Sequence, residues 1–519
     1  MKRDEMLARL DEVAEWDFAV IGGGATGLGI AIDAASRGYS TVLVERSDFA
    51  KGTSSRSTKL IHGGVRYLKQ GNISLVLESL HERGILRDNA PHLVHDLPFI
   101  VPNYDWWEAP FYGIGLRLYD VLAGKHGFGP SRNLSIEETV ERIPTIETKG
   151  LRGGVIYYDG QFDDARLAIN MAQTAAEQGA ALVNYMNVTA LVKSEEFVSG
   201  LIAQDVESGR EHEIRAKVVI NATGVFTDSV RRLDHADAKP MIRPSQGVHI
   251  VLDRSFLPGD SAIMVPETDD GRVLFAIPWH GRTLVGTTDT PVDEILEEPR
   301  PFKDELEFLL EHAARYLTKD PTPADVLSTF AGLRPLVGPT DEDDTAAISR
   351  DHTVHISRGG LVTVAGGKWT TYRKMAEDAV DQAAMLSGVE VVPCVTRDLH
   401  LHGHHLHAEQ FDDLAIYGSD APAILDLLRN DPRYAERVHE DEPYRVGEIV
   451  WSVRHEMART VEDILARRTR MLLLDARRSI EMAPRVAEIM AEELSRDTAW
   501  QRDQVAAYTE LARGYIIGG

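Results

Sequence analysis

The chain has 519 residues, of which 43% are hydrophobic and 26% are charged. These values exclude a largely disordered chain and collagen-like or coiled-coil architectures, and the length predicts two or three domains. The formal net charge of −25 excludes a basic nucleic-acid-binding protein, and an anionic substrate would need a local cluster of cations. The single cysteine, Cys394, excludes an internal disulfide and favours a reducing, cytosolic compartment.

The N-terminal residues lack the features of a signal peptide. Charges are spread through Met1 to Phe18, whereas a signal peptide needs an apolar core. The longest apolar run, Phe18 to Ile32, has about 15 residues and five glycines, so it is too short and too glycine-rich for a membrane helix. We therefore expect any contact with a membrane to be peripheral.

The most regular unit of the sequence begins shortly after the N-terminus. Residues 18–21 form a short apolar run that predicts a buried parallel strand, and residues 25–37 predict an alanine-rich helix. Gly38 stands where a helix C-cap is expected, and a second apolar strand follows at 41–44. The unit is therefore strand, glycine turn, helix and strand, and it ends on Glu45.

The glycine turn matches the pattern G-x-G-x-x-G at Gly22, Gly24 and Gly27. The first glycine allows the tight turn, the second lets a pyrophosphate approach the backbone, and the third allows close packing of helix on strand. The pyrophosphate then lies at a helix N-terminus, which attracts negative charge. Glu45 stands at the right distance for ribose hydroxyls and disfavours a 2′-phosphate, so the unit predicts FAD or NAD rather than NADP.

Three further segments are candidates for contact with the cofactor. A hydroxyl-rich stretch just beyond Glu45 is suited to bind phosphate or the flavin edge, although such a stretch is equally typical of a solvated loop. An Asn-Ala-Thr-Gly segment ends a strand, and a pair of glycines precedes a long helix, whose N-terminus favours an anionic group such as the N1–C2=O edge of reduced flavin. These candidates are Thr53, Ser54, Ser55, Thr223, Gly224, Gly366 and Gly367.

The rest of the chain divides into a strand-rich part and a helical part. Residues 182–224 contain several short strands, and residues 245–290 predict an antiparallel sheet inserted between parallel elements. An apolar strand at 361–365 and a helical pattern at 370–386 follow. From about residue 411 to 513 the pattern is helical, which predicts a separate C-terminal domain.

Several long motifs in a fixed order resemble one family. Residues 54–68 spell SSRSTKLIHGGVRYL, and residues 366–377 spell GGKWTTYRKMAE. Together with NATG, GTTD, GLRPL, ISRD and the string VRHEMARTVEDILARRTR at 453–470, these motifs resemble the FAD-dependent, aerobic-type glycerol-3-phosphate dehydrogenase family. The resemblance covers nearly the whole chain from about residue 15, so it is far more specific than a glycine fingerprint.

The resemblance implies an α/β fold with a glutathione-reductase-type FAD-binding domain, an inserted antiparallel substrate-binding sheet and a C-terminal all-helical domain. The FAD-dependent oxidoreductase region would cover residues 15–390, a linker would cover 391–410, and the helical domain would cover 411–519. Within the first region we expect FAD-binding segments at about 15–90, 150–230 and 345–390, and the substrate-binding sheet at about 91–149 and 231–344.

The resemblance also implies a reaction and partners. Members oxidise sn-glycerol 3-phosphate to dihydroxyacetone phosphate by hydride transfer from C2 to FAD, and they pass the electrons to a quinone at a membrane or, in some oxidases, to oxygen. We expect noncovalent FAD, because Cys394 lies outside every cofactor motif. We also expect a cytoplasmic protein, peripheral on the inner face of the cell membrane, with a homodimer as one option and with no nucleic-acid partner.

Cations that stand among glycine and apolar residues form the expected substrate site. Such cations need an anionic partner if they are buried, and a substrate phosphate supplies one. On the family motifs we assign phosphate binding to Arg66, Tyr67, Arg350 and Lys368, and polarisation of the C2 oxygen to Arg334. The division between these two roles stays open among the cations.

His62 is the expected catalytic base. It precedes two glycines, so its backbone can lie close to a ligand, and a histidine with a near-neutral pKa is suited to remove the C2 hydroxyl proton. The alternative is a histidine whose hydrogen bonds are satisfied in the core. Our expected catalytic pair is therefore His62 and Arg334.

Two other functions fit parts of the pattern. A related FAD-dependent amine or 2-hydroxy-acid oxidase would need only one or two cations for its carboxylate substrate, and a flavin-binding module without turnover would need none. The segment HLHGHHLH at 400–407 invites a metal interpretation, but no acidic or cysteine ligand is spaced with it. We therefore expect no metal site.

Overall fold

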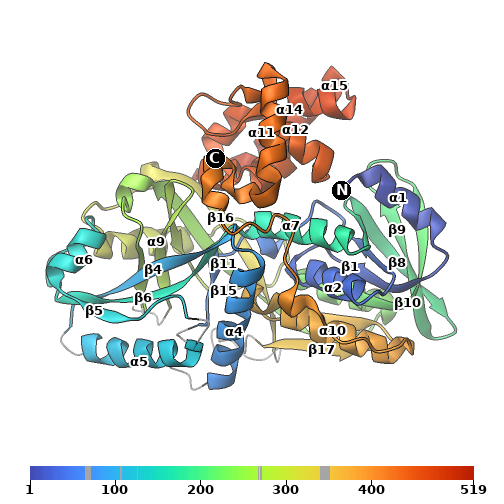
Figure 1. The fold of residues 1–519 in the computed structure, drawn as a ribbon, viewed down its shortest axis with the longest axis horizontal. Helices are drawn as coiled ribbons and strands as arrows, with labels where there is room; N and C mark the ends of the chain where they lie inside the picture. The colour runs from blue at the N-terminus through green and yellow to red at the C-terminus, as the bar shows by residue number, and fades with distance from the viewer. Residues whose placement is uncertain are drawn as a thin grey trace.

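Two β-sheets and a cap of helices make up the structure (Figure 1). The computed structural model describes residues 1–64, 72–105, 108–124, 127–266, 268, 272–338 and 351–518, with the side chains of 108–112 left out of the description. The two sheets lie side by side, and the helices of the C-terminal residues gather over one end of both (Figure 1).

The first sheet carries the unit expected from the N-terminal glycine pattern. Its order is β17-β18-β10-β1-β2-β7, and β1 pairs in parallel with both β10 and β2. An antiparallel extension adds β9 to β10 and β8 to β9. The strands are β1 (Trp16–Ile21), β2 (Thr41–Val44), β7 (Ala181–Val183), β8 (Met186–Ser194), β9 (Phe197–Asp205), β10 (Glu211–Asn221), β17 (His352–Ile356) and β18 (Val362–Gly366).

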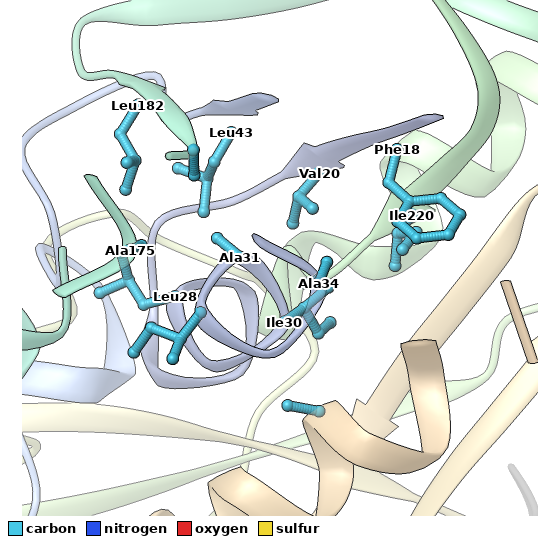
Figure 2. Close-up of a cluster of buried hydrophobic side chains, with 14 of the residues drawn as sticks. Phe18, Val20, Leu28, Ile30, Ala31, Ala34, Leu43, Ala175, Leu182 and Ile220 are labelled. Carbon is cyan, nitrogen blue, oxygen red and sulfur yellow. The ribbon is translucent and has the colours of Figure 1, made fainter. Parts of the chain in front are cut away.

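The core of this sheet explains why its strands are almost wholly apolar. Phe18 and Val20 of β1, Leu43 of β2 and Ile220 of β10 lie over helix α2 (Ala25–Ser36), as Figure 2 shows. Because helices cover the parallel strands, residues on both strand faces are buried, and a continuous apolar run results. The helices of this part are α1 (Arg3–Glu12), α2, α7 (Asp164–Glu177), α8 (Thr227–Asp234) and α10 (Tyr372–Ser387).

The second sheet is mostly antiparallel, as expected for residues 245–290. Its order is β15-β11-β14-β13-β12-β4-β6-β3, with β16 paired to β11 and β5 paired to β6. The strands are β3 (Leu60–Ile61), β4 (Val94–Asn103), β5 (Arg132–Leu134), β6 (Gly153–Phe162), β11 (Ile242–Asp253), β12 (Ala262–Val265), β13 (Leu274–Trp279), β14 (Arg282–Gly286), β15 (Thr290–Pro291) and β16 (Val326–Val337). The helices beside it are α4 (Ile73–Asn89), α5 (Glu108–Ala123), α6 (Ile136–Arg142) and α9 (Lys303–Tyr316).

Two strands from the expected FAD-binding segments pair within the second sheet. These are β3, from residues 15–90, and β6, from residues 150–230. The cause is a long antiparallel ladder in which β6 pairs with β4 from Val94↔Phe162 to Asn103↔Gly153, while β3 pairs with the end of β6. The chain therefore returns to the first sheet only with α7, which follows β6.

The C-terminal domain is helical, as the sequence predicts. Its apolar side chains, among them Leu465, Met482 and Val486, share one core with Trp279 and Phe330 of the second sheet. Its α-helices are α11 (Ala421–Asn430), α12 (Val446–His455), α13 (Met471–Leu474), α14 (Ala476–Leu494) and α15 (Thr498–Arg513), and residues Asp463–Arg468 form the π-helix η10. In the described ranges no helix is both long and apolar enough to cross a membrane.

The histidine-rich segment before this domain forms turns rather than a strand. His402 contacts two carboxylates, Glu177 through Nδ1 at 2.6 Å and Asp420 through Nε2 at 2.8 Å. Burial alone would lower the pKa of His402, but the hydrogen bonds to Asp420 and Glu177 outweigh it and raise the pKa to about 9. A protonated His402 therefore joins helix α7 to the start of the C-terminal domain.

This joint predicts a pH-dependent contribution to stability. Because the folded pKa of His402 is raised, its contribution is complete below the ordinary histidine pKa near 6.5 and disappears as pH rises through about 9. We expect His402→Gln to lower the thermal unfolding temperature clearly at pH 6 and little at pH 10. Differential scanning fluorimetry at both pH values checks this. His407→Gln, at an exposed neighbouring position, is the control, and an equal loss at both pH values for His402→Gln would contradict the assignment.

Candidate active site

A cavity of about 400 Å³ lies at the carboxyl ends of the parallel strands of the first sheet. The residues that follow β1, β2 and β10 and the end of β18 line it, which is the place where open α/β sheets bind ligands. Of the residues expected to bind the cofactor, those in the lining are Gly22, Gly24, Glu45, Thr53, Ser54, Thr223, Gly224, Gly366 and Gly367.

The glycine turn has the geometry that its sequence predicts. Gly22 has φ +108°, a conformation that favours glycine, and a Cβ there would lie 2.7 Å from the carbonyl oxygen of Ala222. Gly27 lies outside the cavity lining, and a Cβ on it would lie 1.9 Å from the carbonyl oxygen of Gly22. The first glycine therefore forms the turn, and the third allows α2 to pack against it.

Glu45 holds the glycine turn as well as lining the cavity. Its carboxylate accepts the N–H of Gly23 at 2.6 Å and the N–H of Ser47 at 2.8 Å. Burial raises the pKa of Glu45, and these two backbone donors oppose that rise. Carboxylate oxygens accept more than one hydrogen bond, so the contacts are compatible with the ribose contact that we expected.

The hydroxyl-rich loop divides between cavity and scaffold. Ser54 Oγ accepts the N–H of Ala25 at 3.0 Å, at the first residue of α2, and Thr53 Oγ1 donates to the carbonyl of Leu333 at 2.6 Å. Ser55 lies outside the lining, with its hydroxyl 3.5 Å from the carbonyl of Gly52. The loop thus presents Thr53 and Ser54 toward the cavity, and Ser55 toward the protein interior.

The opposite wall comes from two segments much later in the chain. Thr223 Oγ1 donates to Asn221 Oδ1 at 2.7 Å, and Gly224 has φ +57°. Gly366 and Gly367 have φ near +77° and +78°, and they lead into the short turn Trp369–Thr371 that precedes α10. Glycine turns, a helix N-terminus and the carboxylate of Glu45 around one cavity fit a dinucleotide such as FAD.

His62 lies beside this cavity, next to the segment that leads into α10. Its N–H donates to Thr370 Oγ1 at 3.3 Å, across 308 positions of sequence. Burial above all lowers the pKa of His62 to about 4, the charges of Lys368 and Arg83 act in the same direction, and Asp159 acts against them. The imidazole is therefore neutral at neutral pH and can accept a proton.

A buried hydrogen-bonded cluster around Asp159, which contacts the residue after His62, was not expected from the sequence. The N–H of Gly63 donates to the Tyr119 hydroxyl at 2.7 Å, and that hydroxyl donates to Asp159 Oδ2 at 2.9 Å. The guanidinium of Arg83 also pairs with Asp159, which is 2% exposed. The one signal in the sequence is an acidic residue inside the largely apolar strand VIYYDGQF, because a buried carboxylate needs partners.

The two described cations of the expected substrate site lie in different surroundings. Lys368 lines the cavity, and its Nζ donates to Ser79 Oγ of α4 at 3.0 Å. Arg334 of β16 donates to Thr287 Oγ1 at 3.1 Å and to Asp289 Oδ1 at 3.3 Å, so GLRPL and GTTD meet. The charge of Lys368 thus acts on His62, and Arg334 contacts the segment after β14. Arg66, Tyr67 and Arg350 lie outside the described residues.

Comparison with known proteins agrees with this geometry. Residues 17–373 match the family model of FAD dependent oxidoreductases, and residues 362–501 match the model of the C-terminal domain of alpha-glycerophosphate oxidase. The chain is 41% identical to the mitochondrial glycerol-3-phosphate dehydrogenase of Rattus norvegicus, over 98% of this chain and 75% of the relative. The corresponding protein of Homo sapiens is also 41% identical, over 99% of this chain and 75% of the relative.

A solved structure extends the comparison to three dimensions. The glycerol-3-phosphate dehydrogenase from Bacillus halodurans, crystallised with FAD, is 31% identical and has a TM-score of 0.81 over 99% of this chain and 97% of that chain. Fold and cavity thus define an FAD-dependent oxidoreductase, with FAD as its cofactor. More narrowly, the chain belongs to the FAD-dependent glycerol-3-phosphate dehydrogenase family, which confirms the resemblance seen in its motifs.

The packing of the glycine turn leads to a test of FAD binding. In Gly27→Ala the new methyl group would clash with the carbonyl oxygen of Gly22, so α2 must move away from the turn. We expect the ratio of FAD to purified protein to fall at least about tenfold, since each ~1.4 kcal/mol of lost binding free energy is a factor of ten. Absorbance of the flavin against that of the protein measures the ratio.

The matched control is Gly115→Ala in α5, where an added Cβ meets nothing within 4 Å. This variant should keep its full complement of FAD. A normal FAD content in Gly27→Ala would show that the third glycine is dispensable for the cofactor site.

Proposed function

We propose that this protein oxidises sn-glycerol 3-phosphate to dihydroxyacetone phosphate, with FAD accepting a hydride from C2. Membership of the family and 41% identity to mitochondrial glycerol-3-phosphate dehydrogenases support this substrate. The observation that carries the proposal is a neutral, half-buried histidine, His62, within the electrostatic influence of Lys368 at the edge of the FAD cavity. That pair combines a proton acceptor with a binder of anions, which this reaction requires.

We assign to His62 the removal of the proton from the C2 hydroxyl. Its lowered pKa keeps the imidazole unprotonated at neutral pH, so no prior loss of a proton is needed. The contact with Thr370 fixes its backbone, and Gly63 is held by the Tyr119 and Asp159 cluster. The histidine is therefore held in place from both sides before substrate arrives.

We assign the phosphate to a cluster that includes Lys368. The substrate dianion supplies the counter-charge that several neighbouring cations need in a partly dry pocket. Arg66, Tyr67 and Arg350 complete the proposed cluster on the strength of their family motifs. Arg334 is proposed to polarise the C2 oxygen as it becomes a carbonyl, since a guanidinium presents fixed donors to a developing charge.

The role of His62 can be tested by rapid kinetics. We expect His62→Asn to slow reduction of the bound flavin by about 10²–10⁴-fold, the range for a positioned general base, and to leave FAD content normal. Stopped-flow bleaching under anaerobic conditions with saturating glycerol 3-phosphate measures this rate directly. In the unaltered protein the rate should fall on the acid side only as pH approaches about 4.

A matched control is His439→Asn, in the C-terminal domain beside Glu481. Its flavin should bleach at the normal rate. An unchanged rate in His62→Asn would remove His62 from catalysis, and bleaching by a simple 2-hydroxy acid at a comparable rate would argue for a different substrate class.

We further propose that the protein works at the inner face of the cell membrane, bound peripherally, and passes electrons to a quinone. The support is an apolar face on helices α4 and α5, which lie next to each other in Figure 1. Helices α4 and α5 pack together through Val76, Leu80, Tyr119 and Ala123. The residues exposed beyond this contact are Ile73, Leu77, Ile114, Leu118 and Val121.

The spacing and exposure of these residues suit a lipid surface. Ile114, Leu118 and Val121 stand at i, i+4 and i+7 of α5, so they share one helix face, and they are 70%, 47% and 75% exposed. The buried sides of the same helices touch Gly63 through Tyr119 and Leu80. The apolar face is therefore one helix layer away from the proposed reaction site, a short route for an apolar acceptor.

Substitutions on α5 test the membrane contact. We expect Leu118→Glu with Val121→Glu to reduce sedimentation with vesicles of phosphatidylethanolamine and phosphatidylglycerol at least about tenfold, because two apolar side chains leave the lipid interface. Flavin reduction by glycerol 3-phosphate should be unaffected, while reduction of a membrane quinone should fall.

The control variant is Phe197→Glu, which alters a side chain that is 61% exposed at the start of β9. It should bind vesicles normally. Undiminished vesicle binding by the α5 variant would place the contact elsewhere, and efficient turnover with oxygen alone would argue against a quinone acceptor.

A further inference from the structure

Three buried arginines of the C-terminal domain contact a loop that lines the FAD cavity, which we call the cofactor loop. The loop of residues 48–55 lines the FAD cavity with Ala50 to Ser54. The side chains of Arg467, Arg468 and Arg470 are 3%, 1% and 2% exposed. They belong to the motif ARRTR, which is part of the string that resembles the family. The proposed reaction assigns no role to this motif.

Each arginine has its acceptor on or beside the loop. Arg467 Nε and Arg468 Nη1 each donate to Asp48 Oδ2 at 2.6 Å, and Asp48 is completely buried. Arg470 Nη2 donates to the carbonyl oxygen of Ser55 at 2.9 Å. Both ends of the loop are therefore bound to the C-terminal domain.

Arg470 also takes part in contacts that connect the loop to the segment leading to His62. Arg470 Nη2 also donates to Asp164 Oδ1 at 2.7 Å, and Lys59 Nζ donates to Asp164 Oδ2 at 2.7 Å and to the carbonyl of Ser55 at 2.8 Å. Lys59 immediately precedes β3, which leads to His62. Arg470 therefore holds the loop, the start of α7 and the start of β3 at one point.

The local backbone of the C-terminal segment is unusual in two respects. Residues Asp463–Arg468 form a π-helix, which is rare and frequently found at functional sites. Arg470 has φ +64°, the left-handed region that a side chain other than glycine rarely adopts. Both features occur in the segment whose arginines contact the cofactor loop.

Electrostatics makes the arrangement reciprocal. A buried guanidinium is costly unless it is paired. Arg467 and Arg468 have further carboxylate partners within their own domain, but they share Asp48, and Arg470 reaches Ser55, only when the 48–55 loop lies in the observed position. From these contacts we infer that the C-terminal domain is a positioning element of the FAD site, in which Arg467, Arg468 and Arg470 hold the loop in the shape that receives the cofactor. By linkage, docking of the domain tightens FAD binding, and FAD stabilises the docking.

The test compares two arginine-to-lysine substitutions at the same domain boundary. Arg470→Lys keeps the charge, but a single ammonium cannot reproduce the planar fork that reaches both Ser55 and Asp164. Arg166→Lys alters an equally buried pair, Arg166 Nη1 with Glu456 Oε1 at 2.5 Å, which joins α7 to the C-terminal domain. Glu456 also contacts Arg468, but among the described residues Arg166 itself makes no hydrogen bond to the loop, so this variant tests the domain boundary without altering a loop contact. Both should lower the unfolding temperature.

The measured quantity is the rate at which FAD leaves the holoenzyme. It is monitored through the rise of flavin fluorescence after dilution. We expect Arg470→Lys to raise this rate about 10- to 100-fold, the effect of losing a charge-assisted hydrogen bond, and Arg166→Lys to change it less than about threefold. The flavin absorption band should also lose its resolved shoulder in Arg470→Lys alone, because the loop is no longer held.

Three results would overturn the proposal. One is an unchanged FAD release rate in Arg470→Lys, and another is an equal acceleration in Arg166→Lys, which would indicate general destabilisation. If Arg470→Lys does not fold, the near-isosteric Asp48→Asn tests the same joint from the loop side, and a normal release rate there is the third. No step depends on the substrate, so the outcome is independent of the proposed reaction.

Discussion

The close approach of helix α2 to the turn after β1 is the constraint on which the rest of the molecule depends. The absence of side chains at Gly22 and Gly27 lets the helix begin directly above the strand ends, so its N-terminus faces the edge where β2, β10 and β18 also end. Three further walls of the cavity are placed against this edge: the 48–55 loop, the turn at Thr223 and the glycine pair before α10. The site is thus a set of distant segments gathered around one backbone contact.

Buried charges then determine how those segments meet. The chain carries a net charge of −25, yet distant elements are joined inside it by buried arginines paired with acids, such as Arg83 with Asp159 and Arg470 with Asp164. A buried ion pair contributes little net stability compared with apolar packing, but a missing partner is strongly unfavourable. Such joints therefore define a unique arrangement of elements more than they stabilise it, which is what a site built from distant segments needs.

The features predicted from sequence are those that neighbouring residues determine. The glycine turn with its helix, the antiparallel region and the helical C-terminal domain all follow from local periodicity, and the structure confirms them. The place of β6 in the second sheet could not be predicted from the sequence. Its partner β4 lies some fifty residues earlier, and strand pairing over that distance leaves no local sequence pattern. For the same reason the contact of Glu45 with Gly23 and the Asp159 cluster emerged only in three dimensions, whereas His62 and Lys368 were found through motifs.

The order in which the cavity walls occur along the chain has a consequence for biosynthesis. During translation the ribosome releases the glycine turn early, but the glycine pair at 366–367 emerges more than 300 residues later, and Arg470 after that. The nascent chain therefore carries an unfinished pocket for most of its synthesis, with β1 exposed on the side that β10 will cover. Cofactor loading is accordingly a late event, and a chain that stops before the glycine pair at 366–367 leaves the ribosome without a complete FAD site.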